Sequence, residues 1–156
     1  MVTIDLLNKH PYLKPALLEL WQREMGRQWY QDTPLQQIEQ WFDNWLNEDR
    51  LPLAYVALKE GKLIGCCTLE INDGIRPDLT PWLGDLIIEP SCRGQNIGDL
   101  LIKETCDKAR ELGYDNIYLF TYELWLNDYY QKRHWQILAK DRFKNRPITI
   151  LSLNLK

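Results

Sequence analysis

The feature that most constrains the fold is a run of three patterns between residues 82 and 121. The sequence WLGDLIIE at 82–89 predicts a strand stopped by Pro90, and NIYLFT at 116–121 predicts another strand. Between them apolar residues recur at helical spacing over 98–112, and Gly113 stands where a helix commonly ends. Strand, helix and strand in this order form a β-α-β unit, whose two strands lie parallel in one sheet.

Upstream of this unit, the sequence predicts two helices and a hairpin. Helical spacing over 11–25 predicts a first helix that ends at Gly26. A second helix is expected to begin at TPLQ, with Thr33 as the cap, Pro34 in the first turn and Gln36 completing a capping box. The β-rich runs over 53–71 predict a hairpin that turns at Glu60-Gly61.

Downstream, residues 124–135 predict a short helix and 147–155 a final strand. No repeat, low-complexity segment or linker divides the chain. We therefore expect residues 1–156 to form one α/β domain, in which a mixed sheet is flanked by helices.

Charge and cysteine usage exclude several classes of protein. The formal net charge is −3 and no cluster of Lys and Arg appears, which argues against a nucleic-acid partner. The four cysteines include no C-x-x-C pair, so neither a zinc site nor a disulfide framework is indicated. No apolar run is long enough for a membrane span and no signal peptide is apparent, so we expect a cytoplasmic protein without a membrane partner.

Residues 93–98, RGQNIG, form a glycine-spaced loop at the start of the predicted helix. The first amides of a helix have no partner within it and lie at the positive end of its dipole, so they attract anions. Gly94 and Gly98 would let a diphosphate approach the backbone. The spacing matches neither the P-loop nor the dinucleotide fingerprint, and on spacing alone a tight turn without a ligand is an equal interpretation.

The stretch IIEPSCRGQNIGDLLI at 87–102 resembles the acetyl-CoA-binding segment of the GNAT acyltransferases. That motif is Arg or Gln, two residues, Gly, one residue, then Gly or Ala; Arg93 takes the first position and Gly98 the last. The likeness covers nearly the whole chain and is greatest to small bacterial members with Pro-Trp-Leu, here 81–83, before the fourth strand. It implies the GNAT fold, a central mixed β-sheet flanked by helices.

The resemblance also implies a site for acetyl-CoA as co-substrate. In the family, backbone amides of the loop hold the pyrophosphate, while strand atoms hold the pantetheine arm and polarise the thioester carbonyl. The positions carried over are Leu86, Ile87, Ile88, Arg93, Gly94, Gln95, Asn96, Ile97 and Gly98.

Asn96 departs from the motif, since it stands where the family has its middle glycine. Asparagine is enriched at positive φ among non-glycine residues. We therefore expect the backbone at Asn96 to adopt that conformation with the side chain turned outward, and coenzyme A binding to survive.

Acetyl transfer to an amine requires a neutral amine, a stabilised oxyanion and a proton for the leaving thiolate. The sequence YYQKRHW at 129–135 resembles the family motif of an aromatic, Tyr, three residues, Gly and an aromatic. This implies that Tyr130 is the general acid and Tyr129 a packing residue; the alternative is that both only pack. His134 replaces the motif's glycine, and we expect it at a solvent-facing helix end rather than in catalysis.

For the general base, the sequence offers two carboxylates. Asp85 lies on the strand of the motif and Glu70 at the end of the hairpin; Asp85 is preferred. Because the family transfers the acetyl group directly in a ternary complex, Cys92 is assigned no nucleophilic role. With only two histidines, no metal site is expected.

The predicted function is an acetyl-CoA-dependent N-acetyltransferase acting on a primary amine of a small molecule or peptide. The main alternative is a non-catalytic acyl-CoA-binding protein with a degenerate site, and a nucleotide-binding module is the third. Trp41, Trp45 and the loop at 70–82 are expected to border the acceptor pocket, unless the two rings pack in the core. Family members often pair through C-terminal strands, so a homodimer is an expected assembly.

Overall fold

The computed structural model describes residues 1–156 and contains a seven-stranded mixed sheet in the order β1-β2-β3-β4-β5-β7-β6. The strands are β1 (Val2–Leu6), β2 (Leu53–Lys59), β3 (Lys62–Glu70), β4 (Trp82–Ile88), β5 (Asn116–Thr121), β6 (Gln136–Phe143) and β7 (Arg146–Asn154). The α-helices are α1 (Lys14–Trp21), α2 (Arg27–Trp29), α3 (Leu35–Asn44), α4 (Ile97–Glu111) and α5 (Leu124–Gln131). Short 3₁₀ turns cover Leu7–Lys9, Pro11–Leu13 and Pro90–Cys92, and a π-helical turn covers Gln22–Gly26. None of the helices combines the length and the hydrophobicity of a transmembrane span.

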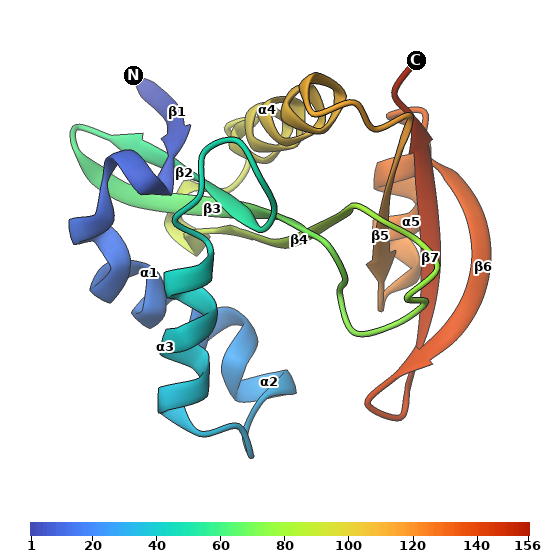
Figure 1. Cartoon of the computed structure of the whole chain (residues 1–156), viewed down its shortest axis with the longest axis horizontal. Helices are drawn as coiled ribbons and strands as arrows, with labels where there is room; N and C mark the ends of the chain where they lie inside the picture. Colours follow the sequence, from blue (N-terminus) through green and yellow to red (C-terminus); the bar gives the residue numbers. More distant parts are fainter.

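The sheet divides into two arms between β4 and β5. These strands are parallel, as the β-α-β pattern predicts, but they share a single register pair, Trp82 with Tyr118. Beyond that pair they diverge, and Figure 1 shows β1–β4 and β5–β7–β6 running in different directions. Strand β4 also carries a β-bulge, because Asp85 and Leu86 together face Cys67 of β3.

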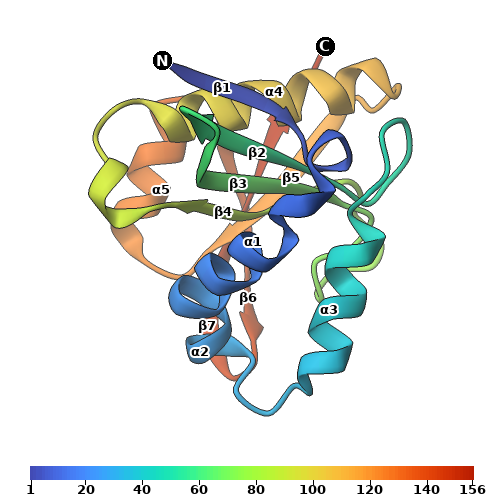
Figure 2. The same cartoon turned by 90° about the vertical axis from the view of Figure 1, so that its left-hand side faces the viewer.

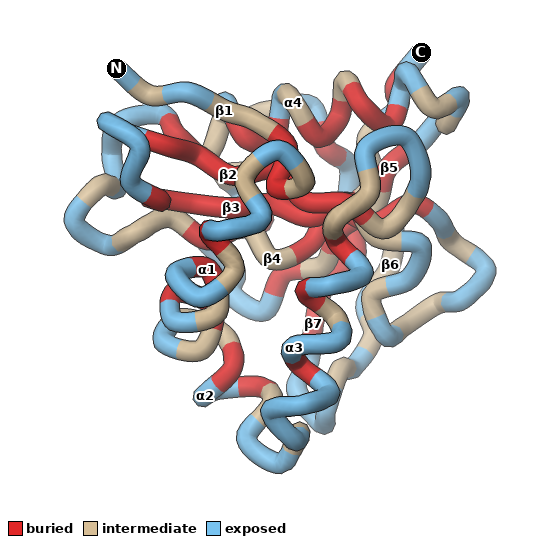
Figure 3. Tube along the Cα trace, turned by 60° about the vertical axis from the view of Figure 1, so that its left-hand side comes forward, coloured by how far each residue is buried: buried red, intermediate tan, exposed pale blue.

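Apolar side chains cover both faces of the first arm. One cluster of 19 buried residues lies under α4 and α5, and another of 14 lies under α1 and α3. Figure 2 shows α4 on one side of β1–β4 and α1 and α3 on the other. Strands β2 and β3 are therefore buried along most of their length, as Figure 3 shows, and they hold the two clusters apart.

The first helix does not end at Gly26, as the sequence predicts. Gly26 has helical angles (φ −62°), and the chain continues through the π-helical turn into α2. A Cβ at this position would lie 2.7 Å from the ring of Trp21, so the glycine permits a close approach of the indole rather than a helix stop. The continuation beyond Gly26 places Gln28, Trp29 and Tyr30 in the wall of a cavity.

The predicted capping box of the second helix is also wrong. Helix α3 begins at Leu35 with Pro34 at the N-cap position, and no side chain caps it. Its apolar face, with Ile38 and Phe42, is buried against the sheet.

The hairpin, β4, β5 and the final strand are confirmed within one or two residues. Both turn residues of the hairpin, Glu60 and Gly61, have positive φ, as a two-residue hairpin turn requires. The two edge strands, β1 and β6, are not predicted by the sequence pattern. Strand β1 is short, and β6 is largely exposed, so neither carries a continuous apolar pattern.

Candidate active site

A cavity of about 740 Å³ opens where β4 and β5 diverge. One wall consists of β4, the 93–98 loop and the start of α4; the opposite wall consists of β5 and α5. Residues 23–25 and 28–30 close one end together with Asp73 and Phe143. The cavity is thus a consequence of the single register pair between two parallel strands.

The structure brings nearly all of the predicted site residues to this one cavity. Gln95 is the exception, because it is exposed and does not line the cavity. The predicted residues that line it are Asp85, Leu86, Ile87, Ile88, Arg93, Gly94, Asn96, Ile97, Gly98 and Tyr130.

The N-terminus of α4 provides a set of unpaired amides. The first helical hydrogen bond runs from Leu100 N–H to the Asn96 carbonyl, and no side chain caps the helix. The amides of Ile97, Gly98 and Asp99 consequently have no partner in the protein, at the positive end of a helix dipole. This geometry fits a diphosphate, since the glycine at 98 leaves the backbone open to the cavity.

Asn96 has the left-handed conformation expected of it, with φ 62° and ψ 19°. Its side chain is exposed and makes no hydrogen bond within the protein. Gly94, two residues earlier, has φ +80°, a region that L-residues rarely adopt. The loop therefore turns at two left-handed positions, and asparagine serves at the second in place of glycine.

The other departure from the family motif has the same geometry. His134, after α5, has φ 75° and is exposed. It therefore takes the left-handed position that glycine usually fills after a helix, and its side chain does not line the cavity.

Asp85 lies at the bulge of β4 with φ 46°, an unusual conformation for a strand residue. Its Oδ1 accepts a hydrogen bond from Trp21 Nε1 at 3.0 Å, and its Oδ2 accepts one from Thr68 Oγ1 at 3.1 Å. Burial raises the pKa of Asp85, and these two hydrogen bonds act against that rise. The bulge thus turns a carboxylate into the cavity and holds it with two donors.

Two further carboxylates lie near Asp85, and neither makes an ion pair. Asp73 comes from the loop after β3, and burial together with the charges of Asp85 and Glu70 raises its pKa well above the usual range. Burial also raises the pKa of Glu70 to about 8, although Trp45 Nε1 donates a hydrogen bond to Glu70 Oε1 at 2.7 Å. Asp85 accepts two hydrogen bonds, whereas Asp73 accepts none. Of these two carboxyl groups, Asp85 is therefore the one that retains the negative charge.

Tyr130 lies across the cavity from β4, on α5. Only 6% of the residue is exposed, yet its hydroxyl makes no hydrogen bond within the protein. Burial is the main cause that raises the pKa of Tyr130, so the phenol keeps its proton at neutral pH. Its ring packs edge-on against Trp135 and Tyr129, which fixes the direction of the hydroxyl.

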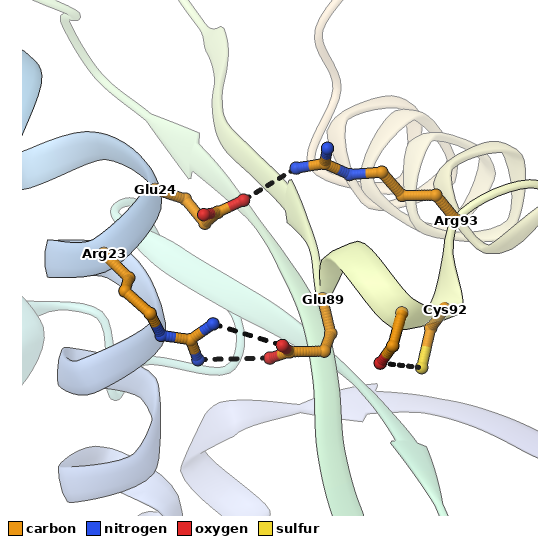
Figure 4. A network of polar contacts seen from close by, with 6 residues as sticks. Arg23, Glu24, Glu89, Cys92 and Arg93 are labelled. Atoms are coloured by element: carbon orange, nitrogen blue, oxygen red, sulfur yellow. Dashed lines mark hydrogen bonds and ion pairs between the residues drawn. The ribbon is translucent and has the colours of Figure 1, made fainter.

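Ion pairs connect the π-helical turn at Gln22–Gly26 to the segment that follows β4, as Figure 4 shows. Arg23 donates two hydrogen bonds to Glu89, at 3.1 and 3.2 Å, and Arg93 donates one to Glu24 at 2.7 Å. The guanidinium of Arg93 is therefore paired with Glu24, whereas the amides at the start of α4 have no partner. Cys92 lies beside these pairs, with its Sγ 3.8 Å from Ser91 Oγ.

The aromatic side chains of the cavity end are not those expected from the sequence. Trp41 and Trp45 do not line it; they pack in the cluster under α3. Trp29 and Tyr30 line it instead, and their rings lie under Arg146 and Lys144, at 4.1 and 4.3 Å from the ring centroids. The sequence pattern does not predict this place for Trp29 and Tyr30, because both follow Gly26, where it predicts that the helix ends.

Of the predicted loop at 70–82, Asp73 alone lines the cavity. None of the apolar residues of the loop does so. No three His, Cys, Asp or Glu side chains are arranged to hold a metal ion. The site is therefore composed of unpaired amides, buried carboxylates and a buried phenol.

Comparisons with known proteins agree with this architecture. The sequence profile of the Acetyltransferase (GNAT) family matches residues 14–135. No curated protein matches the chain. Solved structures do match the chain. Their sequence identities are low, so the match describes the fold alone.

An aminoglycoside 6′-N-acetyltransferase solved with coenzyme A is 19% identical, with a TM-score of 0.75 over 99% of this chain and 97% of that one. An N-acetyltransferase from Staphylococcus aureus Mu50 is 16% identical, with a TM-score of 0.77 over 100% and 99%. A GNAT family acetyltransferase from Elizabethkingia anophelis with acetyl-CoA bound is 18% identical, with a TM-score of 0.67 over 98% and 97%.

Proposed function

Since the chain belongs to the acetyltransferase (GNAT) family, we propose that it transfers an acetyl group from acetyl-CoA to a primary amine, directly and in a ternary complex. Acetyl-CoA supplies the activated acyl group. The residues of the chain bind it, orient the acceptor and move two protons. We also propose a cytoplasmic location, to which the buried thiols of Cys66, Cys67 and Cys106 are suited.

The cradle before α4 is proposed to hold the diphosphate. The unpaired amides of Ile97, Gly98 and Asp99 support this role, because they point positive charge at the cavity. Leu86 lies at the bulge of β4 and has no register partner in β5, so its backbone is free to bond the pantetheine arm or the thioester oxygen. Ile87 and Ile88 supply the apolar part of this wall.

Asp85 is proposed as the general base. An alkylammonium has a pKa of about 10.4 in water, so it must lose a proton before it can attack a thioester at neutral pH. A carboxylate whose pKa is raised by burial accepts that proton better than an exposed one, and Asp85 is such a group on the cavity wall. The negative charge that Asp85 retains favours a cationic acceptor over a neutral one.

Tyr130 is proposed as the general acid that protonates the leaving thiolate. A buried phenol without a partner has a proton to donate and no competing acceptor. The observation that carries the whole proposal is that Asp85 and Tyr130, from different arms of the sheet, line the same cavity as the amide cradle. Base, acid and cofactor cradle are thereby within reach of one bound thioester.

The acceptor is proposed to be a small amine or a peptide amine that enters beside Tyr30 and Asp73. An aminoglycoside is one candidate, because a solved protein of the same fold is an aminoglycoside 6′-N-acetyltransferase. The alternative function is a non-catalytic acyl-CoA-binding protein. It is favoured by the two replaced glycines, at Asn96 and His134, but both keep the left-handed backbone of the motif.

The test combines calorimetry with turnover. Acetyl-CoA is titrated into the protein, and loss of thioester absorbance is then followed with aminoglycosides, polyamines and peptides with free N-termini. Absorbance avoids a thiol reagent, which would also modify the half-buried Cys92. We expect tight binding and acceptor-dependent thioester loss with at least one cationic amine. Binding without loss of thioester against any acceptor would favour the non-catalytic alternative.

A further inference from the structure

The end of α5 is attached to the start of α4 by one arginine. Arg133 donates from Nε to Asp99 Oδ1 at 2.6 Å and from Nη2 to Asp99 Oδ2 at 3.2 Å. Asp99 is in the first turn of α4, directly after the glycine at 98. This two-pronged ion pair joins helices that lie on opposite walls of the cavity.

Two more contacts fix the orientation of this guanidinium. Arg133 Nη1 donates to the Tyr129 carbonyl at 2.9 Å, and the guanidinium carbon lies 3.6 Å from the centroid of the Tyr129 ring. The Tyr129 hydroxyl in turn donates to Asp99 Oδ1 at 2.9 Å. Arg133, Asp99 and Tyr129 therefore form a closed network, in which the planar group is stacked as well as hydrogen-bonded.

The network leaves part of Arg133 unused. A guanidinium has five N–H donors, and three of those of Arg133 are engaged. The two that are left belong to Nη1 and Nη2, and Arg133 lines the cavity with 35% of its side chain exposed. A fixed guanidinium with one free N–H on each of two nitrogens can bond the oxygens of a phosphate.

The negative charge of Asp99 lies beside the amides that are proposed to bind the diphosphate. The hydrogen bond from Arg133 is the main cause that lowers the pKa of Asp99, so its carboxyl group is ionised at neutral pH. An anion bound to the amides of Ile97 and Gly98 would face this negative charge unless a cation neutralised it. Arg93 makes no contact with Asp99, and its guanidinium is paired with Glu24 instead (Figure 4).

We propose that Arg133 is a ligand of the coenzyme A diphosphate, contributed by the turn after α5, opposite the amide cradle, and held in place by Asp99 and Tyr129. The proposal rests on the proposed function only in that the chain must bind coenzyme A. The two free N–H groups of Arg133 bond diphosphate oxygens, while its pairing with Asp99 removes the repulsion that this carboxylate would otherwise exert.

The test is calorimetric and uses three ligands: coenzyme A, dephospho-coenzyme A and pantetheine. For Arg133→Gln we expect the Kd of coenzyme A and of dephospho-coenzyme A to rise together, by about 10- to 100-fold, because charge-assisted hydrogen bonds are lost. The Kd of pantetheine, which carries no phosphate, should stay unchanged. For Arg133→Lys, the Kd values of these two ligands should lie between those of the wild type and of Arg133→Gln, since lysine keeps the charge but not the paired donors.

The matched control is Arg110→Gln. Arg110 also pairs with a carboxylate of α4, donating to Asp107 at 2.8 Å, but at the far end of the helix and outside the cavity. It changes the net charge by the same amount and should leave all three Kd values unchanged. Thermal unfolding of each variant checks the fold; if Arg133→Gln does not fold, Arg133→Lys carries the comparison.

The proposal is overturned if Arg133→Gln binds coenzyme A as tightly as the wild type, or if pantetheine binding weakens equally. It is also overturned if coenzyme A weakens and dephospho-coenzyme A does not, because the ligand of Arg133 would then be the 3′-phosphate. Failure of the proposed function has a different signature: the wild type would bind coenzyme A and show the Arg133 effect, yet acetylate no acceptor.

Discussion

The loop before α4 and the opposite end of the cavity hold their polar groups in different ways. The loop comes from one continuous segment, 93–99, and presents backbone amides. The acceptor end is assembled from the turn at 23–30, the residues after β3, the bulge of β4 and the turn between β6 and β7. It presents side chains, chiefly the carboxyl groups of Asp73 and Asp85.

This difference predicts how each region responds to substitution. An amide cradle depends on backbone conformation, so any residue that adopts the required φ preserves it, as Asn96 does with φ 62°. A buried carboxylate cannot be replaced in this way, because its charge, its donors and its burial all set its proton affinity. The acceptor end should therefore be sensitive to changes of single atoms that the cradle would tolerate.

The largest effect is expected for Asp85→Asn. This change removes the proposed base but keeps the shape, and general base catalysis typically contributes about 10²- to 10⁴-fold. We expect kcat to fall by about that factor with little change in the Kd of acetyl-CoA. Asp73→Asn is the matched control: Asp73 accepts no hydrogen bond and its raised pKa keeps it protonated, so kcat should change less than about tenfold. Equal losses in the two variants, measured by steady-state kinetics, would remove the distinction between them.

A smaller effect is expected in the cradle, where Asn96→Gly and Asn96→Val test the backbone argument. Glycine retains the left-handed conformation, so the Kd of acetyl-CoA should change less than about threefold. Valine at φ 62° is strained by about 1–2 kcal/mol, so the Kd should rise by about 5- to 30-fold. Calorimetry measures both. A gain of orders of magnitude in Asn96→Gly would mean that asparagine had disabled the cradle.

The smallest effect should appear in stability rather than activity, with Glu70→Gln. Burial raises the pKa of Glu70 to about 8 in the folded chain, whereas an unfolded glutamate has a pKa of about 4.3. Between these values the folded state binds a proton that the unfolded state lacks, so Glu70 lowers stability as the pH rises. Glutamine has no charge to bury and can still accept the hydrogen bond of Trp45.

Thermal unfolding measured against pH tests this linkage. Glu70→Gln should match the wild type near pH 4 and unfold at a progressively higher temperature than the wild type up to about pH 8. A constant difference at all pH values would show that Glu70 does not titrate in this range.

The cofactor wall could be predicted from the sequence because its signals are local. Strand β4, the glycines of the loop and the helical spacing of α4 are contiguous, and the left-handed conformation at Asn96 follows from its residue type. The divergence of β4 from β5 could not be predicted, because it depends on the register between two strands of different arms.

The acceptor end could not be predicted for a related reason. Its residues are far apart in sequence, and no local pattern shows that Asp73 reaches Asp85 or that a bulge turns Asp85 into the cavity. Gly26 was misread as a helix stop because glycine serves both helix ends and close packing, and only the position of the Trp21 ring distinguishes them. That one error removed Trp29 and Tyr30 from the predicted site.

If the cradle binds the cofactor while Asp85 and Tyr130 carry the chemistry, Tyr130→Phe should separate binding from turnover. This variant removes only the Tyr130 hydroxyl, which makes no hydrogen bond in the protein. The fold and the Kd of acetyl-CoA should therefore be unchanged. The rate of acetyl transfer should fall by about 10²-fold or more, because the leaving thiolate loses its proton donor. The measurement is calorimetry of acetyl-CoA and thioester turnover on the same samples. Unchanged turnover with unchanged binding would contradict the account.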